Sequence, residues 1–103
     1  MRLTGADIQP YLAMAAALAA GLEGVERKLD PPPETTNAYA AADAPALPRT
    51  LAEATARFRA SAVARKWFGD AFVDHYAATR EWEVRQFDKA VTDWELARYL
   101  ESI

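Results

Sequence analysis

The sequence predicts an all-α chain of about four helices with one long proline-rich loop. Apolar residues recur at steps of three and four, no segment alternates with the two-residue period of a strand, and two Thr-x-x-Glu boxes mark helix starts. A length of 103 residues fits one domain or part of one, and no internal repeat is present. We expect helices at about 8–29, 50–67, 70–91 and 92–101, and a loop at 30–49.

The first helix is unusual because residues 11–22 contain no charged side chain and no amide side chain. Asp7 is a candidate N-cap, and Pro10 suits a first turn, where an N–H group has no acceptor within the helix. The other faces are mostly alanine, and Gly21 and Gly24 are expected to let another backbone approach closely. The large apolar side chains recur along a single face: Met14, Leu18, Leu22, Val25 and Leu29.

This helix is too short to cross a bilayer and too apolar to lie in water. Its uncharged stretch is about 18 Å long, against about 30 Å of hydrocarbon in a membrane. Exposing its large apolar side chains would forgo roughly 1.5–3 kcal/mol each, and a whole domain is stable by only ~5–15 kcal/mol. We therefore expect the helix to be buried in a larger fold or a tight assembly, and the isolated chain to self-associate. The alternative is that its alanine face contacts water at little cost.

The loop and the second helix follow from local composition. Residues 30–49 hold five of the six prolines and no apolar period, which predicts a loop lying over another surface. Thr50 and Glu53 form a capping box at the start of the second helix. Its inward stripe is expected to contain Leu51, Ala54, Phe58, Ala62 and Trp67.

The last two helices also carry start signals. Asp70 is expected to cap the third helix, and Glu81 and Arg85 have the spacing of an i,i+4 ion pair on its wet side. Thr92 and Glu95 form the capping box of a short final helix. The buried face of the third helix is predicted to contain Val73, Tyr76, Val84, Phe87 and Val91, with Arg80 among them.

Composition excludes several classes of function. The net charge is −3 and no basic cluster is present, which argues against nucleic acid or an anionic membrane as a partner. The chain has no cysteine, so it has no disulfide framework and no thiolate metal site. Asp7 precedes the apolar run and no cleavage site follows it, which argues against a secretory signal. We expect a cytoplasmic protein.

The residues by themselves assemble no complete active site and no metal site. His75 is the only histidine, and without a second histidine or a cysteine it has no metal-ligand spacing, so we expect it to be structural or solvated. Ser61 and Ser102 have no neighbouring base that would activate a nucleophile. The three tryptophans are expected to be core or interface aromatics: Trp67, Trp82 and Trp94.

Arg2 is the remaining candidate binding residue. It lies shortly before the N-terminus of the apolar helix, where a guanidinium and the helix dipole both favour a carboxylate or a phosphate. On spacing alone, a mobile terminal arginine is the simpler interpretation.

Two stretches resemble the C-terminal catalytic part of glutamine synthetases. That family has a Glu-x-Arg motif, a short turn with Asp, then Asn-Pro-Tyr-Leu and an Ala-rich helix ending in Gly-Leu-x-Gly. Residues 2–29 read RLTGADIQPYLAMAAALAAGLEGVERKL, which is similar to this pattern. The tail, with LPRTLAEATARF and VTDWELARYLE, looks like the closing helices of the family. It is more similar to the branch that includes γ-glutamylpolyamine synthetases than to the ammonia-assimilating enzymes.

The resemblance implies a fold and an activity. Residues 1–103 would be the C-terminal piece of a larger α+β catalytic domain. The family joins the γ-carboxylate of glutamate to ammonia or an amine: ATP phosphorylates the carboxylate, the amine displaces phosphate, and Mg²⁺ or Mn²⁺ offsets the negative charge. The expected partners are the rest of the catalytic domain or sister subunits of a homo-oligomer.

The resemblance also assigns a role to Arg2. It falls on the arginine of Glu-x-Arg, which is implicated in holding the substrate or phosphoryl group, and the glutamate, a metal ligand, would lie two positions earlier. Gln9 replaces the family's Asn before Pro10, and Asn caps a helix more readily than Gln, which puts the local turn in doubt. The family's nucleotide site, metal ligands and other arginines have no match, so we expect the isolated chain to be inactive and to need no cofactor.

Two other interpretations stay open. One is a stand-alone helical interaction module that associates with a ligase subunit. The other is an unrelated helical bundle whose similarity lies only in its Ala-rich composition.

Overall fold

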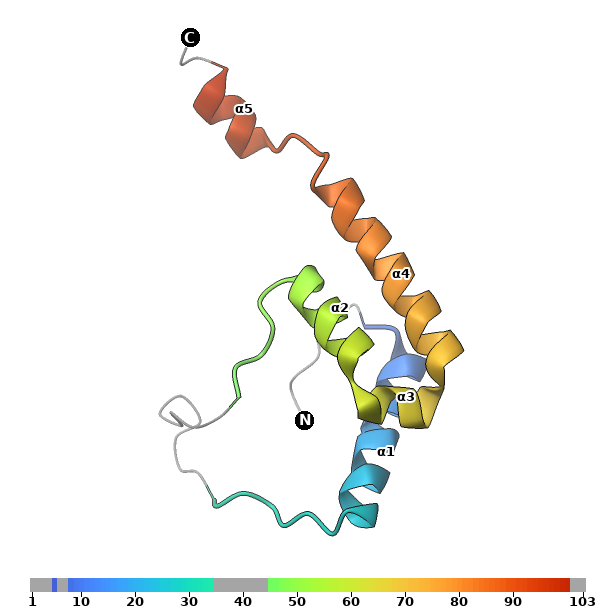
Figure 1. Ribbon diagram of the computed structural model, residues 1–103. Helices are drawn as coiled ribbons and strands as arrows, with labels where there is room; N and C mark the ends of the chain where they lie inside the picture. Colours follow the sequence, from blue (N-terminus) through green and yellow to red (C-terminus); the bar gives the residue numbers. More distant parts are fainter. Residues whose placement is uncertain (1–4, 6–7, 35–44, 101–103) are drawn as a thin grey trace. The chain divides into compact units, whose positions relative to one another are not determined.

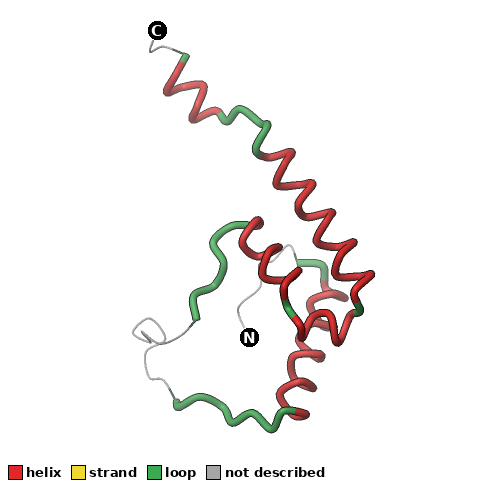
Figure 2. Tube along the Cα trace, in the orientation of Figure 1, coloured by secondary structure: helices red, strands yellow, loops and turns green. Residues whose placement is uncertain are grey.

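The computed structural model describes residues 5, 8–34 and 45–100, and these form five α-helices and no strand (Figures 1 and 2). This part of the chain is therefore all-α, as predicted. The chain divides into two units, residues 1–46 and 47–103, and each is described by itself. The first contains α1 and the second contains the other four helices: α1 Pro10–Glu26, α2 Leu51–Ala60, α3 Ala62–Phe68, α4 Asp70–Phe87 and α5 Asp93–Tyr99.

The helix α1 is capped at its start by Gln9. Oε1 of Gln9 accepts a hydrogen bond from the backbone N–H of Leu12 at 2.6 Å, and Pro10 occupies the first turn. Gln9 therefore fills the capping role that we expected Asn to fill more readily, because its extended backbone (φ −75°, ψ 109°) turns the side chain over the first turn. Asp7, the cap candidate from the sequence, lies outside the described residues.

The end of α1 comes at Glu26, three residues before the predicted end at Leu29. The N–H of Lys28 donates to the carbonyl of Val25 at 3.1 Å, and the N–H of Leu29 donates to that of Gly24 at 3.0 Å. This pair of bonds is a Schellman motif, which satisfies carbonyls at a helix end. Lys28 has a φ of 50°, the left-handed conformation that glycine usually supplies here. The helix thus stops although the apolar pattern continues.

The predicted single helix at 50–67 is two helices, α2 and α3, divided at Ser61. Ser61 has an extended backbone (φ −74°, ψ 112°), and its Oγ accepts from the N–H of Ala64 at 3.1 Å. One serine therefore ends α2 and caps α3. The apolar period does not reveal this break, because it arises from a hydroxyl that competes for backbone hydrogen bonds. The residues that the structure describes accordingly contain five helices where four were expected.

A glycine separates α3 from α4. Gly69 has φ 81° and ψ 152°, a region that only glycine occupies without strain. Gly69 takes the N-cap position of α4, so the prediction that Asp70 is the cap was wrong. Asp70 is the first residue of the helix, where its negative charge interacts favourably with the helix dipole.

The core of the second unit lies where α4 packs on α2 and α3. Val73 and Ala77 of α4 are 0% exposed. Phe58 of α2 meets Tyr76 of α4 edge to face, with ring centroids 5.7 Å apart. Thr55 of α2 is also buried, and its hydroxyl donates to a backbone carbonyl one turn earlier at 2.7 Å. The first half of the predicted apolar face of α4 is thus covered.

The second half of that face is less covered among the described residues: Val84 is partly buried, whereas Val91 is 67% exposed. α4 ends at Phe87, before the predicted 91, and Phe87 is 72% exposed. The final helix α5 starts as predicted: Thr92 Oγ1 accepts from the N–H of Glu95 at 3.2 Å, and the Glu95 carboxylate accepts from the N–H of Thr92 at 2.8 Å. The capping box of α5 is therefore confirmed.

The capping box at α2 forms with one difference. Thr50 Oγ1 accepts from the N–H of Glu53 at 3.1 Å, as predicted. The Glu53 carboxylate reaches one residue further back than expected and accepts from the N–H of Arg49 at 2.9 Å. The segments 30–34 and 45–49 contain neither helix nor strand, which agrees with the predicted loop, and residues 35–44 lie outside the described part.

Candidate functional site

The apolar face of α1 is the main exposed feature of the first unit. The side chains predicted to share one face are all exposed, with Leu18 at 66% and Val25 at 75%. Within α1, Ala19 alone is buried. No described helix combines the length and the apolar character needed to cross a membrane. The face is thus a surface that nothing in this chain's described residues covers: Met14, Leu18, Leu22, Val25 and Leu29.

The two glycines of α1 also face open space. A Cβ added at Gly21 or Gly24 would meet no heavy atom of the structure within 4 Å. The close backbone packing predicted for these glycines is therefore not made by the described residues.

A groove in the second unit lies between the start of α2 and the end of α4. It encloses about 640 Å³. Its apolar lining includes Leu51 of α2 with Val84 and Phe87 of α4. Glu83 and Asp88 lie among the same lining residues, which contain no basic side chain. The groove is thus apolar with a carboxylate rim.

Arg65 is the centre of a charged cluster where the three helices meet. Its Nε donates to the backbone carbonyl of Arg59 at the end of α2, at 3.0 Å. Its Nη1 donates to Asp70 at 2.7 Å and its Nη2 to Asp74 at 2.8 Å. These hydrogen bonds hold the pKa of Asp74 below its usual range and raise the pKa of Arg65. One guanidinium thereby joins α2, α3 and α4.

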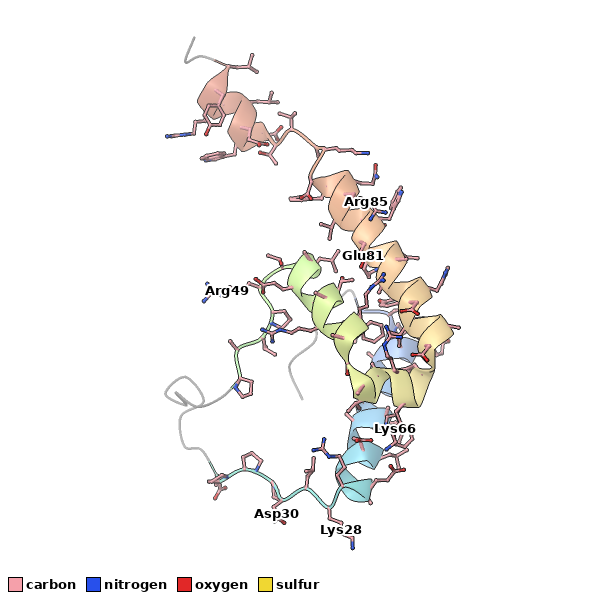
Figure 3. The ribbon with its side chains drawn as sticks, in the orientation of Figure 1. Lys28, Asp30, Arg49, Lys66, Glu81 and Arg85 are labelled. Atoms are coloured by element: carbon pink, nitrogen blue, oxygen red, sulfur yellow. The ribbon has the colours of Figure 1, made fainter. Side chains whose placement is uncertain are left out.

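A second ion pair links α2 and α4. Nη2 of Arg59 lies 3.0 Å from the carboxylate of Glu81, and both side chains are about two-fifths exposed. Glu81 therefore pairs with Arg59 across helices, where the sequence predicted a pairing with Arg85 along α4. Figure 3 labels Glu81 and Arg85 on α4. Arg80 contacts Tyr76, with its guanidinium carbon 5.4 Å from the ring centroid.

The other candidate residues from the sequence are the histidine, the two serines and the three tryptophans. His75 is exposed and lies with Thr79 and Trp82 along an open surface of α4. Ser61 is a helix cap, and Ser102 lies outside the described residues. Trp67 is partly buried, whereas two of the tryptophans expected in a core or an interface are largely exposed: Trp82 and Trp94.

Arg2, the predicted substrate-binding residue, lies outside the described residues. Among the residues that are described, no three His, Cys, Asp or Glu side chains lie together as a metal ion would require.

Sequence reasoning missed the Arg65 cluster. The partners of Arg65 lie five and nine residues later, beyond the break at Gly69. Rules for ion pairs within a single helix consider spacings of three and four only. Gly69 between two helical patterns was the one signal in the sequence that pointed to a turn bringing these residues together.

Comparisons with known proteins extend the resemblance found in the sequence. Residues 1–99 match the profile of the glutamine synthetase catalytic domain. The chain is 46% identical to type-1 glutamine synthetase 2 of Dictyostelium discoideum, 48% to glutamate–isopropylamine ligase of a Pseudomonas species, and 48% to γ-glutamylethanolamide synthetase of Streptomyces coelicolor. These alignments cover 99%, 99% and 97% of this chain.

The same alignments cover 20%, 23% and 22% of the three relatives. The chain thus spans about a fifth of the length of the curated relatives that it matches. The matched profile includes both stretches on which the resemblance was based, the apolar helix and the closing helices. An unrelated bundle of Ala-rich composition would not match at this identity over nearly its whole length. The chain therefore belongs to the glutamine synthetase family.

Proposed function

We propose that this chain forms the helical C-terminal part of the catalytic domain of an ATP-dependent ligase. The enzyme would join the γ-carboxylate of glutamate to an amine or to ammonia, with γ-glutamyl phosphate as the intermediate. The observation that supports this proposal is the family match over residues 1–99, together with identities near one half to ligases of this kind. Two of the three relatives are named for an amine product or substrate, which favours an amine over ammonia.

ATP and the Mg²⁺ or Mn²⁺ ions would be held by parts of the enzyme other than the residues described here. The described residues offer no metal cluster, so no catalytic step is assigned to them. Arg2 would contribute one positive charge to the substrate or phosphoryl group, by analogy with the family motif. The exposed apolar face of α1 would be covered by the rest of the catalytic domain or by a sister subunit in the cytoplasm.

A chimera tests this proposal. The chain replaces the matching segment of the Pseudomonas glutamate–isopropylamine ligase, and amine-dependent ATP hydrolysis is measured. We expect the chimera to retain activity. Changing Arg2→Ala in the chimera should lower kcat/KM by about 10²–10³, the usual cost of losing a charge-stabilising donor. Arg2→Lys should retain part of the activity because it keeps the charge.

The isolated chain provides the complementary measurement. We expect no ATP hydrolysis above background with glutamate and amines in the presence of Mg²⁺ or Mn²⁺. Metal-dependent turnover by the isolated chain would contradict the assignment of these sites to other parts of the enzyme. A folded chimera with no activity would contradict the ligase role itself.

The second candidate function is a helical interaction module that binds a ligase subunit. The exposed apolar face of α1 is the observation that favours it. A pull-down of an intact homologous ligase by the chain, reduced by Leu18→Glu on that face, would support this candidate. Leu47→Glu, at an exposed apolar residue outside α1, is the matched control.

A further inference from the structure

The exposed face of α1 is suited to an apolar protein surface. Residues 11–22 carry no charged and no amide side chain, so burying this stretch would leave no charge without a partner. Its large side chains remain in water: Tyr11 is 74% exposed, Met14 63% and Leu18 66%. Apolar residues exposed singly are common, whereas a contiguous apolar patch marks an interaction site.

The second unit has a core of its own, and α1 does not. Val73 and Ala77 of α4 are 0% exposed, Thr55 of α2 is 4% exposed, and Arg65 joins three helices by hydrogen bonds. Within α1, Ala19 alone is buried. Helices in proteins gain most of their stability from packing of an apolar face. α1 therefore needs a partner surface that the second unit does not need.

The lengths of the relatives indicate which surface this is. The alignments cover 20%, 23% and 22% of the three ligases, and the match to the family profile over residues 1–99 includes α1. Most of the length of such a ligase thus lies outside the segment that matches this chain. That larger portion is the best-supported partner for the face of α1.

We propose that α1 docks through this face onto the larger portion of a ligase catalytic domain without a covalent link to it. The identity of the partner follows from the proposed function, on which the inference rests. Leu18 would be buried in the contact. Gly21 and Gly24, where an added Cβ would meet no heavy atom within 4 Å, would let the partner's backbone come close. An intact ligase would not bind, because its own segment occupies the same place.

A cut chimera tests docking without a covalent link. A specific protease site is placed directly before residue 1 of this chain in the chimera with the Pseudomonas ligase, and the folded protein is cut. Size-exclusion chromatography at several concentrations compares the cut and uncut proteins. We expect the two pieces to elute together, because the apolar contact is already formed when the chain is cut.

Two substitutions on this face measure its share of the contact. Leu18→Glu should raise the dissociation constant of the cut pieces about tenfold or more, because it buries a charge without a partner. Leu18→Ala should weaken the contact less, since it only shortens the side chain. Leu47→Glu, at a residue 62% exposed and outside α1, is the matched control and should change little. Circular dichroism confirms that each variant keeps its helices.

Two further measurements identify the contact and its partner. Amide hydrogen exchange in α1 should be fast in the isolated chain and slow in the cut chimera, because docking protects the helix. The tagged chain is also co-expressed with the Pseudomonas ligase that lacks the matching segment, or with the intact ligase. We expect the shortened ligase to co-purify with the chain and the intact ligase not to.

The outcomes decide the inference. Pieces that separate after the cut overturn it, and so do α1 amides that stay unprotected or an intact ligase that binds as well as the shortened one. Equal effects of Leu18→Glu and Leu47→Glu also overturn it. Release of the chain as a dimer would place a second copy on this face instead, with the same consequence.

Failure of this inference differs from failure of the proposed function. A folded, uncut chimera without activity contradicts the ligase role. An active uncut chimera whose pieces separate after cutting contradicts only the docking of α1 without a covalent link.

Discussion

The guanidinium of Arg65 in α3 and the carboxylate of Asp74 in α4 lie 2.8 Å apart, across the Gly69 turn that separates their helices. The same guanidinium also donates hydrogen bonds to the carboxylate of Asp70, in the first turn of α4, and to the backbone carbonyl of Arg59, at the end of α2. A single side chain thus joins three consecutive helices. The planar, forked geometry of arginine permits three such bonds at once.

Replacing Arg65 should therefore loosen the second unit. We expect Arg65→Lys to lower the melting temperature of the chain, because an ammonium group cannot match the fork that binds both carboxylates and the carbonyl. Thermal unfolding followed by circular dichroism measures the change. Arg85→Lys, at an exposed arginine of α4 outside this cluster, is the matched control and should have a smaller effect. Equal melting temperatures for the two variants would show that the Arg65 cluster does not stabilise the fold.

The Asp74 carboxylate should make stability depend on pH. Hydrogen bonding from Arg65 lowers the pKa of Asp74 in the folded chain below the unfolded value of about 3.9. Its contribution is thus complete above the unfolded pKa and is lost as pH falls through the folded pKa. The melting temperature of the unchanged chain should exceed that of Asp74→Asn at pH 6, and the difference should shrink below about pH 4. A difference that stays constant down to pH 2 would contradict this.

Gly69 should not tolerate a side chain. Its φ of 81° and ψ of 152° lie where a Cβ causes backbone strain, although an added Cβ would meet no heavy atom within 4 Å. Gly69→Ala should therefore destabilise the chain by about 1–3 kcal/mol through backbone conformation alone. Gly21→Ala, within α1, should instead stabilise its helix by roughly 0.5–1 kcal/mol. Chemical denaturation of both variants measures the two effects, and a loss at Gly21 as large as at Gly69 would refute the backbone explanation.

Lys28 offers a stabilising substitution. It has a φ of 50° at the position of the Schellman motif where glycine is usual. Lys28→Gly should stabilise the end of α1 by about 0.5–1 kcal/mol, because glycine adopts this conformation without a Cβ penalty. Lys28→Ala removes the same charge but keeps the Cβ, and should give no gain. Amide hydrogen exchange at Leu29, whose N–H closes the motif, measures the local change.

Local signals in the sequence predicted much of the secondary structure. Thr92 and Glu95 form the capping box of α5, and the stripe from Met14 to Val25 lies along one exposed face of α1. These features depend on residues within four positions of one another. The breaks were harder to predict: Ser61 divides α2 from α3 with a single hydroxyl, which leaves the apolar period almost unchanged.

The candidate sites also divide into those that a local motif predicts and those that depend on contacts between helices. Arg2 was proposed from a family motif and lies outside the described residues, so its role remains a prediction. The Arg65 cluster and the groove under Phe87 were not predicted at all. Both join residues from different helices, and no spacing along a single helix encodes them.

By itself, the sequence determined that the chain is helical, that α1 has a long uncharged surface, and that its motifs belong to the glutamine synthetase family. Only the tertiary structure decided which side chains meet across helices, such as Glu81 with Arg59 rather than with Arg85. The physical reason is that hydrophobic period and capping act over one or two turns. The angles between α2, α3 and α4 depend instead on two backbone breaks and on the packing around Val73.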